Sequence, residues 1–213
     1  MDFRVLGPME VAGAEGSVPL GGPKQRAVLA HLLVRANRVA SFDSLVDGLW
    51  GEEPPETARA TIHAYVHNLR KALGPGRIQS SAPGYVLRVE TDEVDASRFE
   101  ALLGDASRLG EEPARAAQVL REAVALWRGA AYADLDELPS LRGEIARLEE
   151  LRLRAVEDQM RFDLAAGRHA DVLGELESLV HDHPLRERLW EHLMLACYRA
   201  GRQGDALAAF EAA

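Results

Sequence analysis

Apolar residues recur at helical spacing through one stretch of the chain, Glu56 to Leu73. One side of a helical wheel collects Ala58, Ile62, Tyr65, Val66, Leu69 and Leu73. The opposite side collects Ala60, Ala64, His67 and Lys71, flanked by Thr61, His63 and Asn68. Alanines let a helix approach a surface closely, and Thr, His, Asn and Arg side chains offer the hydrogen-bonding groups that base edges and phosphates accept. The pattern predicts a DNA recognition helix; the alternative is an ordinary amphipathic helix with a mildly basic solvated face.

The charge distribution favours the first of these interpretations. The chain has a net charge of −9, yet residues 57–89 contain Arg59, Arg70, Lys71, Arg77 and Arg88 and no Asp or Glu. Residues 1–94 hold ten Lys or Arg and eleven Asp or Glu, a net charge of −1, whereas residues 95–213 have a net charge of −8. The acidity therefore belongs to the second half, and it does not argue against nucleic-acid binding by the first.

Shorter patterns surround the predicted recognition helix. Two short β-rich runs, 3–11 and 17–20, predict a small antiparallel sheet, and Pro23 is placed to open the next helix. Residues 42–50 have the spacing of a short helix that Ser41 or Asp43 can cap. After Gly74-Pro75-Gly76, two short strands flank a Ser-Ser-Ala-Pro-Gly turn within residues 77–89. This order predicts an α+β winged helix-turn-helix over residues 1–94, with Arg77, Ser80 and Ser81 on the wing able to reach phosphate or the minor groove.

From Asp95 onward the pattern is almost continuously that of amphipathic helices. Gly167 and Gly201 are 34 residues apart, the period of tetratricopeptide repeats. The tetratricopeptide signature positions of the second unit are occupied by Trp190, Leu193, Gly201, Ala206, Phe210 and Ala213. We therefore expect residues 95–213 to form an all-α tetratricopeptide-like repeat domain with a concave groove for a protein partner. The alternative is a scaffold for folding and dimerisation alone. Because the helical pattern is still in progress at Ala213, we expect the sequence to be truncated from a longer regulator.

The first half resembles the OmpR/PhoB-type winged-helix domain. The resemblance rests on GGPKQRAVLAHLL, on LVDGLWGEEPPETARATIHAYVHNLRKALG, and on Pro83-Gly84-Tyr85 in the wing. In this form the motifs are similar to those of the Streptomyces antibiotic regulatory proteins and their AfsR-like and EmbR-like relatives, and the second half resembles the bacterial transcriptional activator domain that follows in that family. By position, the resemblance implies that Thr61, His63, Ala64, His67, Asn68 and Arg70 face the major groove. Several family members carry Arg or Ser where this chain has His67 and Asn68, so the resemblance gives no base preference.

The resemblance implies a sequence-specific transcriptional activator of antibiotic or other secondary-metabolite genes. Its partners would be direct repeats in promoter DNA, RNA polymerase through the sigma factor or alpha subunit, and a second copy of the chain on DNA. The alternative is a protein-interaction scaffold or signalling adaptor in which the winged helix only docks. Residues 1–213 contain no membrane span or signal peptide, which predicts a cytoplasmic protein. We find no convergent catalytic set, cofactor motif or metal cluster, so we expect neither enzyme activity nor a cofactor, and we expect the single cysteine, Cys197, to be a core residue.

Overall fold

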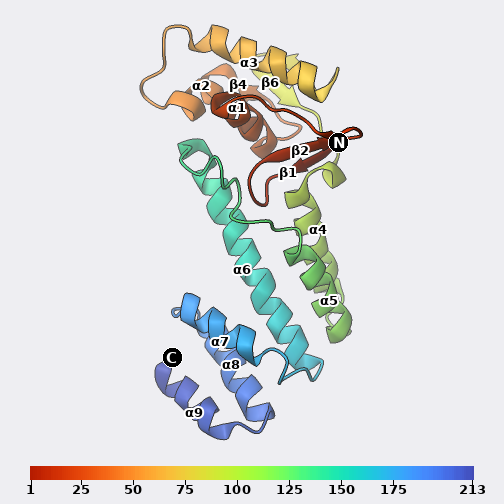
Figure 1. The fold of residues 1–213 in the computed structure, drawn as a ribbon, viewed down its shortest axis with the longest axis vertical. Helices are drawn as coiled ribbons and strands as arrows, with labels where there is room; N and C mark the ends of the chain where they lie inside the picture. The colour runs from red at the N-terminus through yellow and green to blue at the C-terminus, as the bar shows by residue number, and fades with distance from the viewer. The chain divides into compact units, whose positions relative to one another are not determined.

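The computed structural model describes residues 1–213, and its contacts divide the chain into two units. Unit 1 comprises Met1–Phe99 and Leu126–Glu150, and unit 2 comprises Glu100–Ala125 and Leu151–Ala213. The strands are β1 (Asp2–Arg4), β2 (Glu10–Gly13), β3 (Gly16–Ser17), β4 (Ala40–Ser41), β5 (Ile78–Ser81) and β6 (Gly84–Leu87). The helices are α1 (Pro23–Val34), α2 (Phe42–Trp50), α3 (Ala58–Leu73), α4 (Asp95–Arg108), α5 (Pro113–Val124), α6 (Arg142–Ala165), α7 (Leu173–Asp182), α8 (Glu187–Arg199) and α9 (Gln203–Ala212) (Figure 1).

The N-terminal sheet of unit 1 is antiparallel, with strand order β1-β2-β3. Phe3 lies opposite Val11, and both side chains are buried. This confirms the small sheet predicted from the two β-rich runs, although β3 is limited to Gly16 and Ser17. The sheet therefore contributes apolar side chains to the core of unit 1.

The helices α1, α2 and α3 follow the predicted order. Proline occupies the first turn of α1, where its missing N–H costs no hydrogen bond. The Ser41 hydroxyl caps α2 by accepting a hydrogen bond from the Ser44 N–H at 3.1 Å. Helix α3 buries Ala58, Ile62, Val66, Leu69 and Leu73, as the apolar spacing predicts.

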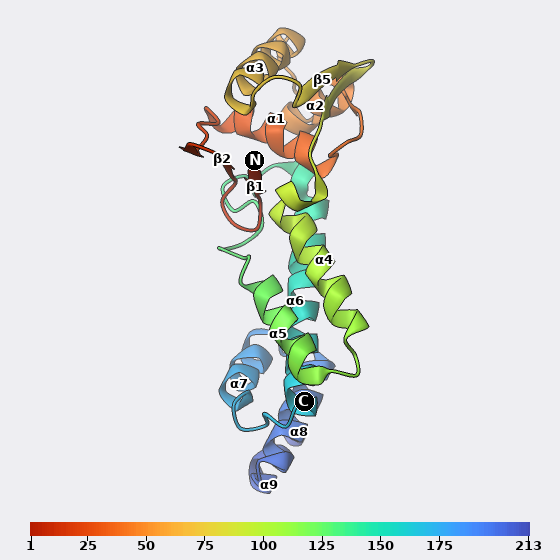
Figure 2. The same ribbon diagram turned by 90° about the vertical axis from the view of Figure 1, so that its right-hand side faces the viewer.

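A second sheet joins the hairpin to the region before α2. Strands β5 and β6 form the predicted wing, and β4 pairs with β6 to give the order β4-β6-β5. In Figure 2 the hairpin containing β5 lies beside α2 and α3. The two-residue strand β4 carries too short a pattern to be predicted from sequence. Its pairing attaches the wing to the start of α2.

Residues 126–150 lie in unit 1, although they follow α4 and α5 in the chain. The Arg128 and Tyr132 N–H groups donate to the carbonyls of Leu6 and Val5 at 2.7 and 2.9 Å. The buried Asp95 carboxylate accepts hydrogen bonds from the Val5 and Leu6 N–H groups at 2.8 and 3.1 Å. Backbone pairing of this kind has no side-chain signature, so it could not be predicted from the pattern of residues. The division at residue 94 expected from sequence stays a prediction.

His31 on α1 predicts a pH dependence of stability in unit 1. It is buried, with Nε2 3.3 Å from the Ser44 hydroxyl, and burial, helped by the nearby Arg35 charge, lowers its pKa from 6.5 to about 4. The unfolded chain therefore binds this proton at a higher pH than the folded chain, so the contribution to stability is complete above pH 6.5 and is lost as the pH falls towards about 4. Urea unfolding across this window should show a smaller fall in the midpoint for His31→Gln than for the unsubstituted protein.

The matched control for this experiment is His67→Gln, because His67 is an exposed histidine of the same unit. It should keep the fall in the midpoint that His31 causes, because His31 is still present. Equal slopes in the unsubstituted protein and His31→Gln would show that His31 does not carry this effect.

In unit 2, two helices end in the same way, and their C-terminal glycines are separated by the predicted 34 residues. Gly167 and Gly201 have φ angles of 83° and 78°, the left-handed region that glycine occupies without strain. The Arg168 N–H donates to the Asp163 carbonyl, and the Arg202 N–H donates to the Cys197 carbonyl, at 3.0 and 2.8 Å. The same cap therefore ends α6 and α8, and the predicted tetratricopeptide-like fold is confirmed by this repetition.

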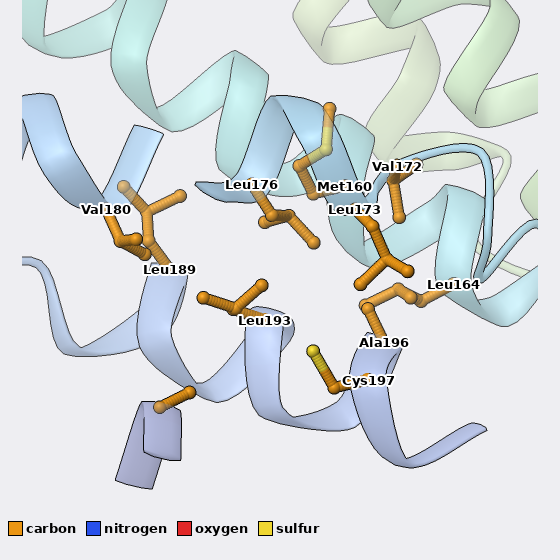
Figure 3. Close-up of a cluster of buried hydrophobic side chains, with 11 residues drawn as sticks. Met160, Leu164, Val172, Leu173, Leu176, Val180, Leu189, Leu193, Ala196 and Cys197 are labelled. Carbon is orange, nitrogen blue, oxygen red and sulfur yellow. The ribbon is translucent and has the colours of Figure 1, made fainter. Parts of the chain in front are cut away.

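Helices α6, α7 and α8 enclose the core of this repeat (Figure 3). Met160, Leu176, Leu189 and Leu193 point into it, and Cys197 is buried at its edge, as expected for a core cysteine. The predicted signature residues behave unequally: Leu193 is buried, Trp190 and Ala206 pack partly buried against the cluster, and Phe210 is exposed. Each helix in the structure is either too short or too polar to span a lipid bilayer.

Glu157 belongs to a run of charged residues on α6, a pattern that is typical of i,i+4 pairs on a helix surface. Glu157 is instead 1% exposed and lies near Arg186 and Arg188 at 3.7 and 3.4 Å. Both arginines lie at the start of α8, so this part of α8 covers Glu157. Packing between helices, which the charge pattern alone does not reveal, decides its environment.

Candidate nucleic-acid interface

The solvent-facing side of α3 has the composition that the helical wheel predicts. Ala60, Ala64, His67 and Lys71 are all exposed and lie along one line of the helix. The apolar residues on the other side fix the rotation of α3 about its axis, because a rotated helix would bury His67 and Lys71. The structure therefore presents a face with two small residues and two polar ones, and Lys71 has no carboxylate partner.

The edge of α3 towards α1 carries Asn68 and Thr61. The Asn68 amide donates to Gln25 Oε1 at 3.2 Å, and Gln25 in turn donates to the Leu20 carbonyl at 3.0 Å. The Asn68 carboxamide is thus oriented by a buried glutamine, and its oxygen is left to accept a hydrogen bond from another partner. Thr61 on the same edge is half-buried.

The opposite edge of α3 is fastened to the wing by Arg70. Its guanidinium donates to the Ile78 carbonyl at 2.9 Å and to the Ser80 hydroxyl at 3.0 Å, and it lies 5.5 Å above the Tyr85 ring. Arg70 therefore forms no ion pair with an acid on the protein surface. The guanidinium instead fixes β5 relative to α3, and its positive charge stays at the junction of the two elements.

Three aromatic rings meet at the first turns of α3. The His63 ring lies 4.8 Å from the Phe42 ring, and the Tyr85 hydroxyl lies 2.6 Å from His63 Nδ1. Arg59 sits 5.5 Å from the Phe42 ring and pairs with Asp43 at 3.2 Å. These residues line an open pocket of about 430 Å³ together with the turn of the wing, Ser81 to Gly84. Polar and aromatic groups from α2, α3 and the wing therefore converge on one hollow.

Arg77, like Arg59, is a predicted DNA contact that pairs with an acid. Its guanidinium donates to both carboxylate oxygens of Glu93 at 2.6 Å, and this pair lowers the pKa of Glu93 to about 2. Ser80 and Ser81 lie at the far end of β5, nearer the turn of the wing. Contact of Arg77 with DNA stays a prediction, and such a contact has to compete with this ion pair.

Sequence reasoning missed three residues that shape the surface: Gln25, Phe42 and Tyr85. It also missed that Asp43 and Glu93, which lie outside the acid-free window, pair with Arg59 and Arg77 inside it. Tyr85 could have been predicted to lie at this surface, because it directly follows Pro83-Gly84 and the turn fixes the position of its backbone. The partners of Gln25 and Phe42 depend on tertiary packing.

Two family models match the chain. The one described as "Transcriptional regulatory protein, C terminal" matches residues 16–87. The one described as "Bacterial transcriptional activator domain" matches residues 94–213. The chain belongs to the bacterial transcriptional activator domain family. This confirms the predicted resemblance to the Streptomyces antibiotic regulatory proteins, which were expected to carry this domain after a winged helix.

Several members of the bacterial transcriptional activator domain family are similar over nearly the whole chain. DnrI, a regulatory protein of Streptomyces peucetius, is 35% identical over 99% of this chain and 82% of its own length. AfsR, a regulatory protein of Streptomyces griseus, is 40% identical over 98% of this chain and 22% of its own length. The solved structure of Mycobacterium tuberculosis EmbR in complex with a low affinity phosphopeptide is 37% identical, with a TM-score of 0.95, over 99% of this chain and 57% of that chain. The chain thus spans about a fifth of AfsR and just over half of EmbR. The fold class predicted from sequence is confirmed.

Proposed function

We propose that the chain binds promoter DNA in a sequence-specific manner and activates transcription. The observation that carries this proposal is the exposed face of α3, where Ala60 and Ala64 permit close approach and His67 and Lys71 project beside them. An acid-free helix face fastened to a hairpin is the arrangement with which winged helices enter a groove and touch the flanking backbone. Membership of a family of transcriptional regulators supports it, and we propose a binding role without catalysis.

The finer parts of the proposal concern partners. We propose that two copies bind direct repeats, that the helical unit contacts either the second copy or RNA polymerase through its sigma factor or alpha subunit, and that the genes controlled belong to secondary metabolism. Similarity to AfsR, RedD and DnrI supports the regulatory context. We also propose that Thr61, His63, Asn68 and Arg70 line the DNA contact beside the central stripe, with Arg59, Ser80 and Ser81 at its edge.

The test is a pull-down of genomic fragments followed by sequencing and a salt titration on the best fragment. Lys71→Ala should weaken binding to every fragment and reduce the slope of log affinity against log salt by about 1, because it removes one phosphate contact. His67→Ala should change which sequences are preferred, with about 1–3 kcal/mol of discrimination lost at one base pair.

Arg108→Ala is the control for charge, since it removes one arginine from an exposed pair with Asp105 on α4. Binding that is equal on all fragments and unaffected by either α3 substitution would contradict the assignment of the surface. Enrichment of short direct repeats would support the proposed pairing of two copies.

A further inference from the structure

The hydrogen bond between Tyr85 and His63 joins the hydroxyl of a buried tyrosine to an exposed histidine. Tyr85 is 4% exposed, on β6, and its hydroxyl has no other hydrogen-bond partner in the structure. His63 is exposed on α3, and its Nδ1 lies 2.6 Å from that hydroxyl. The other ring nitrogen, Nε2, has no partner within the protein. The bond therefore links the wing to one side of the imidazole and leaves the other side available.

The direction of this bond follows from what each group can satisfy. A neutral imidazole carries its proton on one nitrogen and accepts on the other. If Nδ1 carried the proton, the hydroxyl of Tyr85, a 4% exposed residue, would have no acceptor within the protein for its own proton, which proteins avoid. If the hydroxyl donates to Nδ1, its proton is satisfied and the imidazole proton is on Nε2. Burial raises the pKa of Tyr85, so the phenol keeps the proton that it donates.

Neighbouring groups hold both rings in this geometry. The Phe42 ring is 4.8 Å from the His63 ring and 5.2 Å from the Tyr85 ring, and the Arg70 guanidinium lies 5.5 Å above the Tyr85 ring. A positive charge over the phenol ring strengthens its hydroxyl as a donor. Arg70 is itself fixed to β5. The ring of His63 is thus oriented from α2 and from both strands of the wing.

We propose that Tyr85 is a positioning residue that fixes the tautomer of His63, so that Nε2–H is presented as a hydrogen-bond donor to an acceptor atom on DNA. This inference rests on the proposed function. A fixed donor distinguishes acceptors from donors: it suits purine N7, guanine O6 or a phosphate oxygen, and it rejects the exocyclic amino groups of adenine and cytosine. His67, one turn further along α3, has no such partner and can present either tautomer.

The first measurement is nitrogen NMR of the histidine side chains in the full chain without DNA. His63 should show the Nε2–H tautomer alone, while His67 shows a mixture and serves as an internal reference; His63→Gln and His67→Gln assign the signals. In Tyr85→Phe, which keeps the aromatic packing and removes the hydroxyl, the His63 signal should move to a mixture like that of His67. A mixture at His63 in the unsubstituted protein, or the Nδ1–H form, would overturn the proposal.

The second measurement is affinity for the best genomic fragment and for an unenriched fragment of the same length. Tyr85→Phe should weaken binding roughly three- to tenfold, the range for one hydrogen bond. In a His63→Gln background, where the amide can donate near the position of Nε2 without help from Tyr85, the same substitution should have no further effect. An equal loss in both backgrounds would mean that Tyr85 acts only through the packing of the wing and would overturn the proposal.

The two fragments distinguish the sources of the acceptor. A loss confined to the enriched fragment assigns the acceptor to a base edge, and an equal loss on both assigns it to phosphate. Absence of DNA binding by the unsubstituted protein would contradict the proposed function, whereas the NMR result separately decides whether Tyr85 fixes the tautomer.

Discussion

Gly84→Ala should destabilise unit 1 by about 3 kcal/mol or more, because a side chain at this position has no space. A Cβ added to Gly84 would lie 2.8 Å from both the Ala40 carbonyl carbon and the Ser41 Cα, and it would also collide with the Ala40 carbonyl oxygen. These are backbone atoms of the strand that pairs with β6, and Ala40 is fully buried. Because the clashing atoms belong to the backbone, no side-chain rotation can relieve the clash. The substitution should therefore separate β4 from β6.

The damage should extend beyond the sheet. Ser41 belongs to β4 and also caps α2, so a displaced β4 removes the cap as well as the strand pairing. The wing would lose its attachment on the side opposite β5. We expect the urea midpoint of unit 1 to fall and DNA binding to be lost with it, as measured on the same preparation.

Gly143→Ala is the matched control for this experiment. Gly143 lies within α6 in unit 1, and nothing lies within 4 Å of a Cβ added there. Alanine is the better helix former, so this substitution should be neutral or slightly stabilising. Unfolding of Gly84→Ala at the same urea concentration as the control would show that β4 and β6 can separate without cost.

The helices α1, α2 and α3 of unit 1 could be predicted because each has a local signal. Pro23 marks the start of α1, Ser41 caps α2, and Gly74 follows the end of α3. The exposed line on α3 follows from the 3.6-residue period alone. The repeat in unit 2 was equally visible, because Gly167 and Gly201 need left-handed backbone at the same point of each repeat.

Contacts between distant segments could not be predicted in the same way. The backbone of residues 128–132 bonds to Val5 and Leu6, and any sequence without proline at the donors could do so. The hydrogen bond from Arg70 to the Ile78 carbonyl of β5 could not be predicted either, because a backbone carbonyl has no signature in the sequence. The DNA contacts of α3 stay predictions.

Asp163→Ala should destabilise unit 2 by about 3 kcal/mol, because it leaves two arginines without the carboxylate that joins them. The Asp163 side chain is 5% exposed, and its oxygens accept from Arg121 Nη1 at 3.1 and 3.2 Å. Arg168, just after α6, also donates to this carboxylate. One buried acid therefore connects α5 with the end of α6.

The expected size depends on burial, and an exposed pair in the same unit tests that point. Asp105 on α4 pairs with Arg108 three residues later, with both side chains at least half exposed, and such pairs contribute less than about 1 kcal/mol. Asp163→Asn keeps an acceptor for Arg121 and removes only the charge, so urea unfolding should place it between Asp163→Ala and Asp105→Ala. If Asp163→Ala costs no more than Asp105→Ala, then desolvation of the buried carboxylate offsets its attraction to both arginines, and packing alone holds α5 against α6.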